Sequence, residues 1–130
     1  MSKRSTLESE VQRRILAEIG AEPDFCVFRN HVGVAKFYDD EGKMRVQHFG
    51  LLRGSPDLVG MLRVGHIAAW VALEIKCPGE DAEPHQAVVH DQWRAFGALV
   101  YVVHSPDEAR AALDDARRQV RASLNAWARV

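Results

Sequence analysis

Two apolar runs, residues 58–62 and 68–75, constrain the fold of this chain more than any other feature. Each is rich in aliphatic residues and has the length of a strand, and Val64-Gly65-His66 lies between them as a turn. The segment therefore predicts an antiparallel hairpin. If the turn is centred between Gly65 and His66, the numbers of paired residues add up to 131. Asp57 then lies opposite Glu74.

This register gathers charges at the open end of the hairpin. Asp57 and Glu74 would have their Cβ atoms about 5 Å apart, and Lys76 shares a face with Glu74 because side chains alternate along a strand. Two carboxylates this close repel unless a proton or a cation lies between them. A hard divalent ion such as Mg²⁺ accepts one or two carboxylates together with water and substrate phosphate. The cluster thus suits phosphodiester cleavage, with Lys76 orienting or deprotonating the attacking water.

Simpler explanations of the same residues stay open from the sequence. Asp57 follows a proline and can be an ordinary turn residue. Glu74 and Lys76 can form a solvated strand face, since surface strands often have such charges.

The other segments predict helices over residues 5–19, 84–96 and about 106–128, and strands over 25–29, 34–38, 43–49 and 98–103. The strands at 34–38 and 43–49 are expected to pair as a hairpin. Leu7, Val11, Ile15 and Ile19 give the first helix one apolar stripe, and Ser105 is expected to cap the last helix in a capping box with Glu108. The order of elements predicts an α/β domain on a mixed sheet.

The length and the charge balance of the chain limit the classes of protein to which it can belong. The chain has 130 residues, which fits one domain, and 17 Lys and Arg against 18 Asp and Glu, so any nucleic acid must be bound by a local patch. We expect no membrane span and no signal peptide, and therefore a cytoplasmic protein. Its two cysteines fit reduced thiols. The scattered histidines do not predict a zinc site, and the phosphate-loop and hydrolase motifs are absent from the sequence.

Residues 54–60 (GSPDLVG) followed by Leu73-Glu74-Ile75-Lys76 resemble the PD-(D/E)xK nuclease signature, and more narrowly that of the VRR-NUC family. Supporting pieces are Phe28-Arg29-Asn30 before Gly33, Pro84-His85-Gln86 before Gly97, and residues 101–103 before Ser105. The resemblance covers about residues 7–113. It implies a restriction-endonuclease-like core, a mixed sheet flanked by helices. We expect one such domain over 1–130, with its core at about 5–113 and a C-terminal helix at about 106–128.

The resemblance also implies roles for individual residues. Asp57, Glu74 and the backbone carbonyl of Ile75 would hold Mg²⁺, with Mn²⁺ as a possible substitute. Lys76 would be the catalytic lysine, and Gln86 would lie beside the site and position metal-bound water or Lys76. The family also uses a glutamate from its first helix.

The glutamate of the first helix is expected to be Glu8, as a further metal ligand. At about 100° per residue, Glu8 falls within the apolar stripe, whereas Glu10 falls on the solvent side. A glutamate on a buried stripe needs a partner, and a metal-bound water or a lysine would be one. The alternative is a capping box formed by Ser5 and Glu8.

The expected activity is that of a metal-dependent DNA endonuclease of replication or repair, encoded by a bacterium or a phage. Arg29, Asn30, Arg53 and Ser55 would contact the nucleic acid, with Arg45 and Arg63 as further candidates. Branched or flapped DNA, including four-way junctions, is the expected substrate. A homodimer is favoured because small nucleases of this superfamily often pair. The apolar seam of the last helix, which ends at Trp127, is one candidate interface. The alternatives are a non-catalytic DNA-binding or assembly module, and a hydrolase of another phosphate ester.

Overall fold

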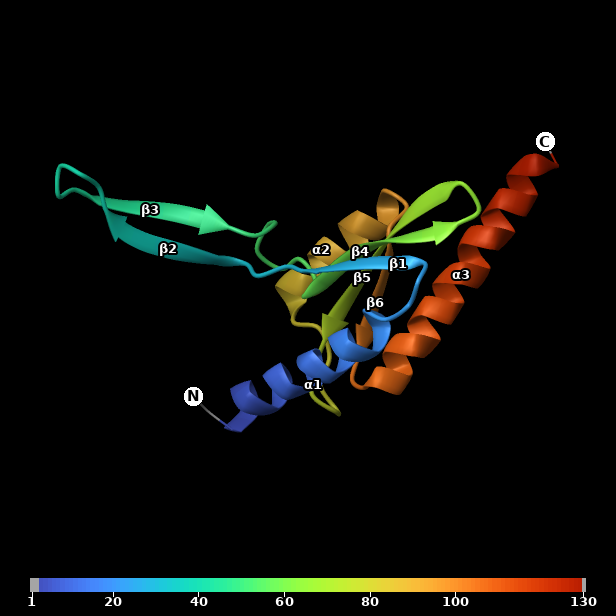
Figure 1. Cartoon of the computed structure of the whole chain (residues 1–130), viewed down its shortest axis with the longest axis horizontal. Coiled ribbons are helices and arrows are strands. Elements are labelled where there is room, and N and C mark those ends of the chain that lie inside the picture. Colours follow the sequence, from blue (N-terminus) through green and yellow to red (C-terminus); the bar gives the residue numbers. More distant parts are fainter. Residues whose placement is uncertain (1–2, 130) are drawn as a thin grey trace.

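A computed structural model describes residues 3–129, with side chains from residue 6 onward. It contains three helices and six strands over these residues, and its outline is extended because one hairpin projects from the body (Figure 1). The helices are α1 (Lys3–Ile19), α2 (Pro84–Ala95) and α3 (Pro106–Ala128). The strands are β1 (Phe25–Arg29), β2 (Gly33–Tyr38), β3 (Met44–Phe49), β4 (Leu58–Val64), β5 (Ile67–Ile75) and β6 (Leu99–Val103).

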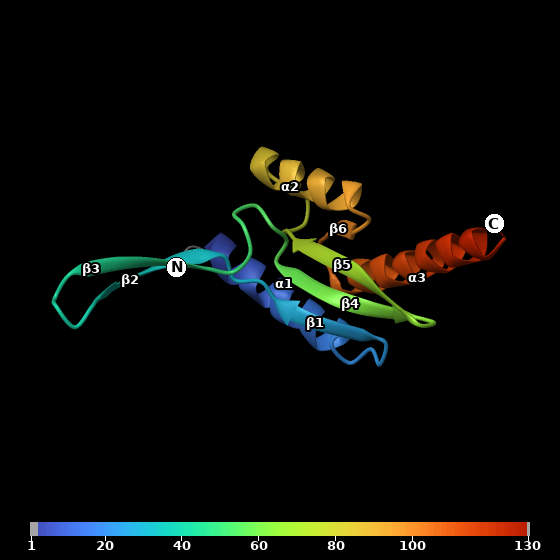
Figure 2. The same cartoon turned by 90° about the horizontal axis from the view of Figure 1, so that it is seen from above.

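The body is built on a four-stranded mixed sheet in the order β1-β4-β5-β6. Its first three strands are antiparallel neighbours, and β6 runs parallel to β5 after the crossover through α2. Helix α2 lies on one face of the sheet, and α1 and α3 lie on the other (Figure 2). The expected mixed sheet flanked by helices is confirmed. No described helix is long and apolar enough to cross a membrane.

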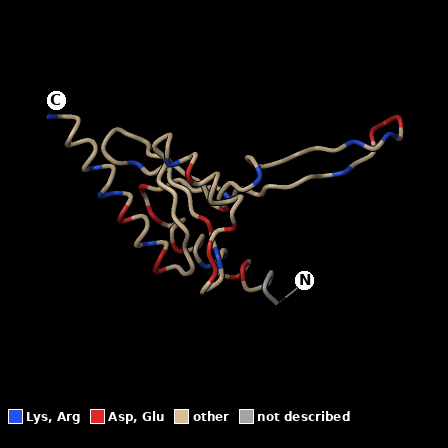
Figure 3. Tube along the Cα trace, turned by 180° about the vertical axis from the view of Figure 1, so that it is seen from behind, with Lys and Arg blue, Asp and Glu red and all other residues tan. Residues whose placement is uncertain are grey.

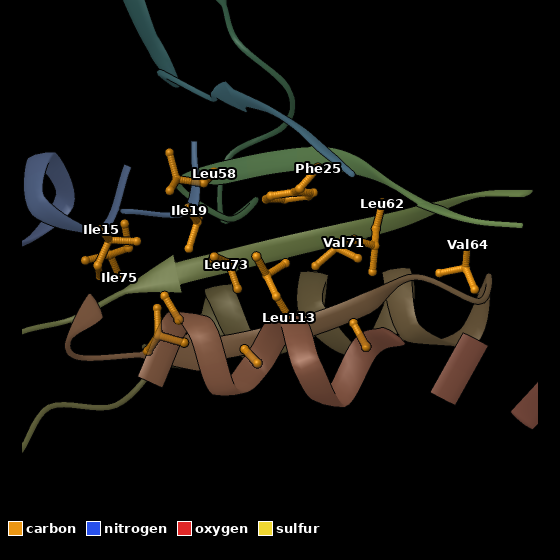
Figure 4. Close-up of a cluster of buried hydrophobic side chains, with 14 residues drawn as sticks. Ile15, Ile19, Phe25, Leu58, Leu62, Val64, Val71, Leu73, Ile75 and Leu113 are labelled. Carbon is orange, nitrogen blue, oxygen red and sulfur yellow. The ribbon is translucent and has the colours of Figure 1, made fainter. Parts of the chain in front are cut away.

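The main core fills the space between the sheet and the helices α1 and α3 (Figure 4). Val71, Leu73 and Ile75 face this core from β5, because alternate residues of a strand share a face. Ala72 faces α2 with Val59 and Val100. Glu74 shares the α2 face by the same alternation, so the strand that supplies the core also turns a carboxylate toward the helix.

The apolar stripe of α1 is buried only in its C-terminal half. Ile15 and Ile19 are fully buried, whereas Leu7 is 56% exposed. The expectation of one continuous buried stripe is therefore wrong at Leu7, because the first turns of α1 extend beyond the sheet (Figure 1). The helix begins at Lys3, so Ser5 lies inside it and cannot be the N-cap. The capping-box explanation of Glu8 thereby loses its basis; the side chain of Ser5 lies outside the described part.

The cap of α3 differs in one detail from the expected capping box. The Ser105 hydroxyl accepts the Glu108 N–H at 3.1 Å, as predicted. The Glu108 carboxylate accepts the backbone N–H of His104 at 3.0 Å, one residue before the predicted partner.

Candidate active site

The predicted register of the central hairpin is correct. The ladder runs from Val64↔Ile67 to Leu58↔Leu73, and all its pairs obey the predicted spacing. Asp57 lies one residue beyond the last pair and reaches across with its side chain, where Oδ2 accepts the backbone N–H of Ile75 at 2.8 Å. Its carbonyl accepts the N–H of Asn30 at 2.8 Å. Asp57 is therefore fixed between β1 and β5 and is more than a turn residue.

Glu74 and Lys76 are buried, with 1% and 6% exposure, so the solvated-face explanation is wrong. The Oε1 atom of Glu74 accepts a hydrogen bond from Nε2 of Gln86 at 2.5 Å and lies 3.8 Å from Nζ of Lys76. Gln86 is held in turn by the N–H of Glu83, which donates to its Oε1 at 2.8 Å. Gln86 thus joins the first turn of α2 to the acidic site.

Burial raises the pKa of Glu74 to about 8, and the neighbouring Asp57 carboxylate raises it further than Lys76 lowers it. Burial also raises the pKa of Asp57, and the donated N–H of Ile75 opposes this shift. Both shifts mean that the site disfavours two negative charges. The acid pair therefore retains a proton near neutral pH, and a nearby cation would lower both pKa values.

Glu8 lies close enough to this pair for its charge to raise the pKa of both Asp57 and Glu74. Its side chain is half-buried, whereas Glu10 is exposed. Of the two candidate glutamates, Glu8 and Glu10, the structure brings Glu8 to the site, and its role as a metal ligand stays a prediction.

His90 belongs to this cluster, and our interpretation of the sequence missed it. The residue is 1% exposed, and its Nε2 lies 3.8 Å from Oε2 of Glu74. Neither atom has a hydrogen-bond partner among the described residues. Burial lowers the pKa of His90, so the imidazole is neutral at pH 7. Helical spacing places His90 on the same face as Gln86, four residues earlier, but this spacing alone does not tell that the face is buried.

The donor set fits a hard divalent ion. No group of three or more His, Cys, Asp or Glu side chains within the described part forms a ready metal cage. Mg²⁺ does not require such a cage, since it keeps several waters and takes one or two carboxylates. The buried Glu74 oxygen without a partner and the raised pKa values of the acid pair mark a place where a cation is favourable.

The four residues expected to contact nucleic acid fall into two groups. Arg29 and Arg53 are exposed, and their role stays a prediction. Asn30 and Ser55 hold the loop before Asp57: the Asn30 side-chain amide donates to Ser55 Oγ at 2.7 Å and to the Pro56 carbonyl at 2.8 Å. Ser55 also donates to the Leu52 carbonyl at 2.6 Å. These two polar side chains thus have structural partners within the chain.

Gly54 fixes the same loop against α2. Its φ is +91°, and a Cβ atom there would lie 2.8 Å from the carbonyl oxygen of His85. A side chain at this position is therefore excluded by backbone conformation and by space. The loop that leads to Asp57 and the helix that carries Gln86 are packed directly together.

A mixed sheet with helices on both faces, and an acid pair beside a buried lysine where β4 and β5 meet, defines a restriction-endonuclease-like fold. More particularly, the chain forms a VRR-NUC-like domain. Four chains of solved structures match it, and one described as "VRR_NUC domain" is 25% identical with a TM-score of 0.51. The match covers 83% of this chain and 95% of that one. No family model and no curated protein matches the sequence. The predicted resemblance is confirmed, and the domain is nuclease-like.

Proposed function

We propose that this chain is a metal-dependent endonuclease that hydrolyses phosphodiester bonds in DNA. The observation that carries the proposal is the cluster of half-buried Asp57 with buried Glu74 and Lys76 in a VRR-NUC-like fold. Burying ionisable groups together costs free energy that a purely structural site has no reason to bear. Perturbed acid pairs of this kind gather at functional sites.

Asp57, Glu74 and the carbonyl of Ile75 would hold Mg²⁺ or Mn²⁺, with Glu8 completing the set. The bound ion would supply Lewis-acid stabilisation of charge on the phosphate and would lower the pKa of water. Gln86 holds Oε1 of Glu74 and so fixes the orientation of that carboxylate. Lys76, 3.8 Å from the same oxygen, is placed to orient the attacking water or to neutralise charge on the phosphate.

Branched DNA is the proposed substrate, including flaps and four-way junctions. The net charge of −1 gives the chain no general attraction to a polyanion. Exposed Arg29 and Arg53 flank the segments that hold Asp57 and would bind phosphates locally. Recognition of DNA shape by such a patch fits this balance better than tight binding to any duplex.

The test is cleavage of supercoiled plasmid and of a labelled four-way junction with Mg²⁺, Mn²⁺ or a chelator. Asp57→Asn and Lys76→Met should abolish metal-dependent cleavage while the variants remain folded. Glu8→Gln and Glu10→Gln form a matched pair on one helix, and only the first should lose activity. If the folded wild-type chain cuts neither substrate with either metal, the proposal is wrong and a non-catalytic DNA-binding module becomes the better explanation.

A further inference from the structure

The two oxygens of the Glu74 carboxylate have unequal surroundings. Oε1 accepts the side-chain amide of Gln86 at 2.5 Å and lies 3.8 Å from Nζ of Lys76. Oε2 has no hydrogen-bond partner among the described residues, although Glu74 is only 1% exposed. A buried acceptor without a donor is unfavourable, and more so when the group is charged. The second oxygen of Glu74 therefore needs a donor whenever the carboxylate is ionised.

His90 faces this second oxygen. Its Nε2 lies 3.8 Å from Oε2 of Glu74, is buried, and also has no hydrogen-bond partner within the described part of the chain. The separation exceeds the length of a hydrogen bond by about 0.8 Å, which a small rotation of the two side chains closes. Two buried polar atoms that face each other, each without another partner, indicate a hydrogen bond that forms when the site changes state.

Helix α2 holds both neighbours of the carboxylate. Gln86 and His90 are four residues apart, so they lie on one face of the helix, one turn from each other. Gln86 reaches Oε1 of Glu74, and His90 faces Oε2. Gln86 is itself fixed, because its Oε1 accepts the N–H of Glu83 at 2.8 Å. We call Gln86 and His90 together the carboxylate clamp.

The charges around His90 favour a neutral ring that donates a proton over a ring that binds the ion itself. Burial is the main cause that lowers the pKa of His90, and the charges of Arg94 and Lys76 lower it further, against the opposite effect of Asp91. The same two cations would repel a divalent ion placed against the ring. A neutral imidazole has one N–H, and the tautomer with this proton on Nε2 can donate it to Glu74.

We propose that His90 is a positioning residue, which donates Nε2–H to Oε2 of Glu74 when the site holds a metal ion. The inference rests on the metal binding in the proposed function and is independent of DNA cleavage. Each carboxylate oxygen has two lone pairs, so an oxygen that accepts a hydrogen bond can still face an ion. A carboxylate held at both oxygens is not free to turn and present both of them to one ion. The carboxylate clamp thus enforces monodentate binding by Glu74.

Monodentate binding has a consequence for the choice of ion. Mg²⁺ requires a compact octahedral set of ligands, whereas Ca²⁺ takes six to eight oxygens in flexible geometry and often binds both oxygens of a carboxylate. Mn²⁺ accepts the same octahedral set of oxygens as Mg²⁺. Lys and Arg are interspersed with Asp and Glu along the trace (Figure 3), so no broad acidic surface attracts cations in general. The donors of the site then determine the preference, and His90 favours small octahedral ions over Ca²⁺.

The test titrates Mn²⁺ and Ca²⁺ into the metal-free full chain by calorimetry, without DNA. In His90→Leu the dissociation constant for Mn²⁺ should rise about tenfold, as is typical when a partner behind a metal ligand is lost. The constant for Ca²⁺ should fall or stay the same, because Glu74 becomes free to bind with both oxygens. His90→Gln keeps a donor and should recover part of the preference. The matched control, His85→Leu, changes a partly exposed histidine of the same helix and should leave both constants unchanged.

Nitrogen NMR of the histidine-labelled wild type tests the hydrogen bond directly. With Mg²⁺ bound, the ring of His90 should carry its proton on Nε2, and the signal that His90→Gln lacks assigns this ring. A proton on Nδ1 in the Mg²⁺-bound chain overturns the proposal, because Nε2 could not then donate. This readout needs no variant to retain its stability, and circular dichroism checks that the variants used for calorimetry remain folded.

The outcomes separate this inference from the proposed function. Mn²⁺ binding with an unchanged preference over Ca²⁺ in folded His90→Leu overturns the inference alone. A wild-type chain that binds neither Mg²⁺ nor Mn²⁺ overturns both. If His90→Leu loses more affinity for Ni²⁺ than for Mn²⁺, His90 is a direct ligand, because Ni²⁺ favours imidazole, and the carboxylate clamp is wrong.

Discussion

Replacing Glu74 with Gln is expected to stabilise the metal-free protein and, under the proposed function, to abolish DNA cleavage. The pKa of Glu74 rises from 4.5 to about 8 on folding, chiefly because the carboxylate is buried. The folded state therefore binds this proton more tightly than the unfolded state. Between about pH 4.5 and pH 8, the contribution of Glu74 to the free energy of unfolding falls as pH rises.

The size of the effect follows from the two pKa values. At full ionisation of Glu74, this difference in pKa lowers the free energy of unfolding by about 5 kcal/mol. The reduction is about 3 kcal/mol at pH 7 and about 1 kcal/mol at pH 5. The neutral amide of Glu74→Gln has no such cost. The free energy of unfolding of the variant, relative to that of the wild type, should therefore increase by about 2 kcal/mol from pH 5 to pH 7.

Urea denaturation of the metal-free wild type and of Glu74→Gln, at pH 5 and pH 7, measures this difference. His90 makes an opposite contribution, since its lowered pKa reduces stability as pH falls, and the same comparison in a His90→Leu background removes it. Mg²⁺ should then stabilise the wild type more than the variant, because a bound ion compensates the buried charge. A difference between the chains that does not change with pH would refute the reasoning, since it would mean that Glu74 is not protonated in the folded protein.

Three further predictions concern residues around the site and the last helix. Gly54→Ala should destabilise the fold by about 1–3 kcal/mol in urea denaturation, because of its positive φ and the close His85 carbonyl; an unchanged midpoint would contradict this. His90→Leu should change the affinity for Mn²⁺ measured by calorimetry, because it removes the imidazole that faces Glu74, and His90→Gln should restore it in part; equal affinities would mean that His90 only fills space. Ser105→Ala should lower stability by about 1 kcal/mol, because the cap of α3 is lost; no loss would mean that the cap is dispensable.

The pairing register of β4 and β5 could be predicted residue by residue, because the turn and the apolar pattern within this one segment determine it. A turn at Gly65 and an apolar pattern of period two allow one register that buries Val71, Leu73 and Ile75. The approach of Asp57 to Glu74 follows from that register alone. Gln86 and Glu8 required the family resemblance, and the helical pattern then distinguished Glu8 from Glu10.

His90 and the β2–β3 hairpin show what the sequence could not supply. A histidine on a helix has no periodic signal that tells a buried ring beside a carboxylate from an exposed one. The pairing of residues 34–38 with 43–49 was correct, because a hairpin is a local structure. Its separation from the main sheet depends on what lies beside it in space, and no local pattern encodes that. The prediction that Leu7 is buried was wrong for the same reason. An apolar stripe on a helix does not show where the surface that it packs against ends.

The unpartnered oxygen of Glu74 has a consequence for how this chain would respond to selection in the laboratory. A library of variants screened only for resistance to heat, without metal, would enrich neutral residues at position 74, because each removes the cost of a buried charge. Survivors of such a screen would be more stable and, under the proposed function, would have lost the carboxylate that holds the metal. Adding Mg²⁺ during the heat step would reverse the preference, so the identity of the winning residue would itself report whether the site binds the ion.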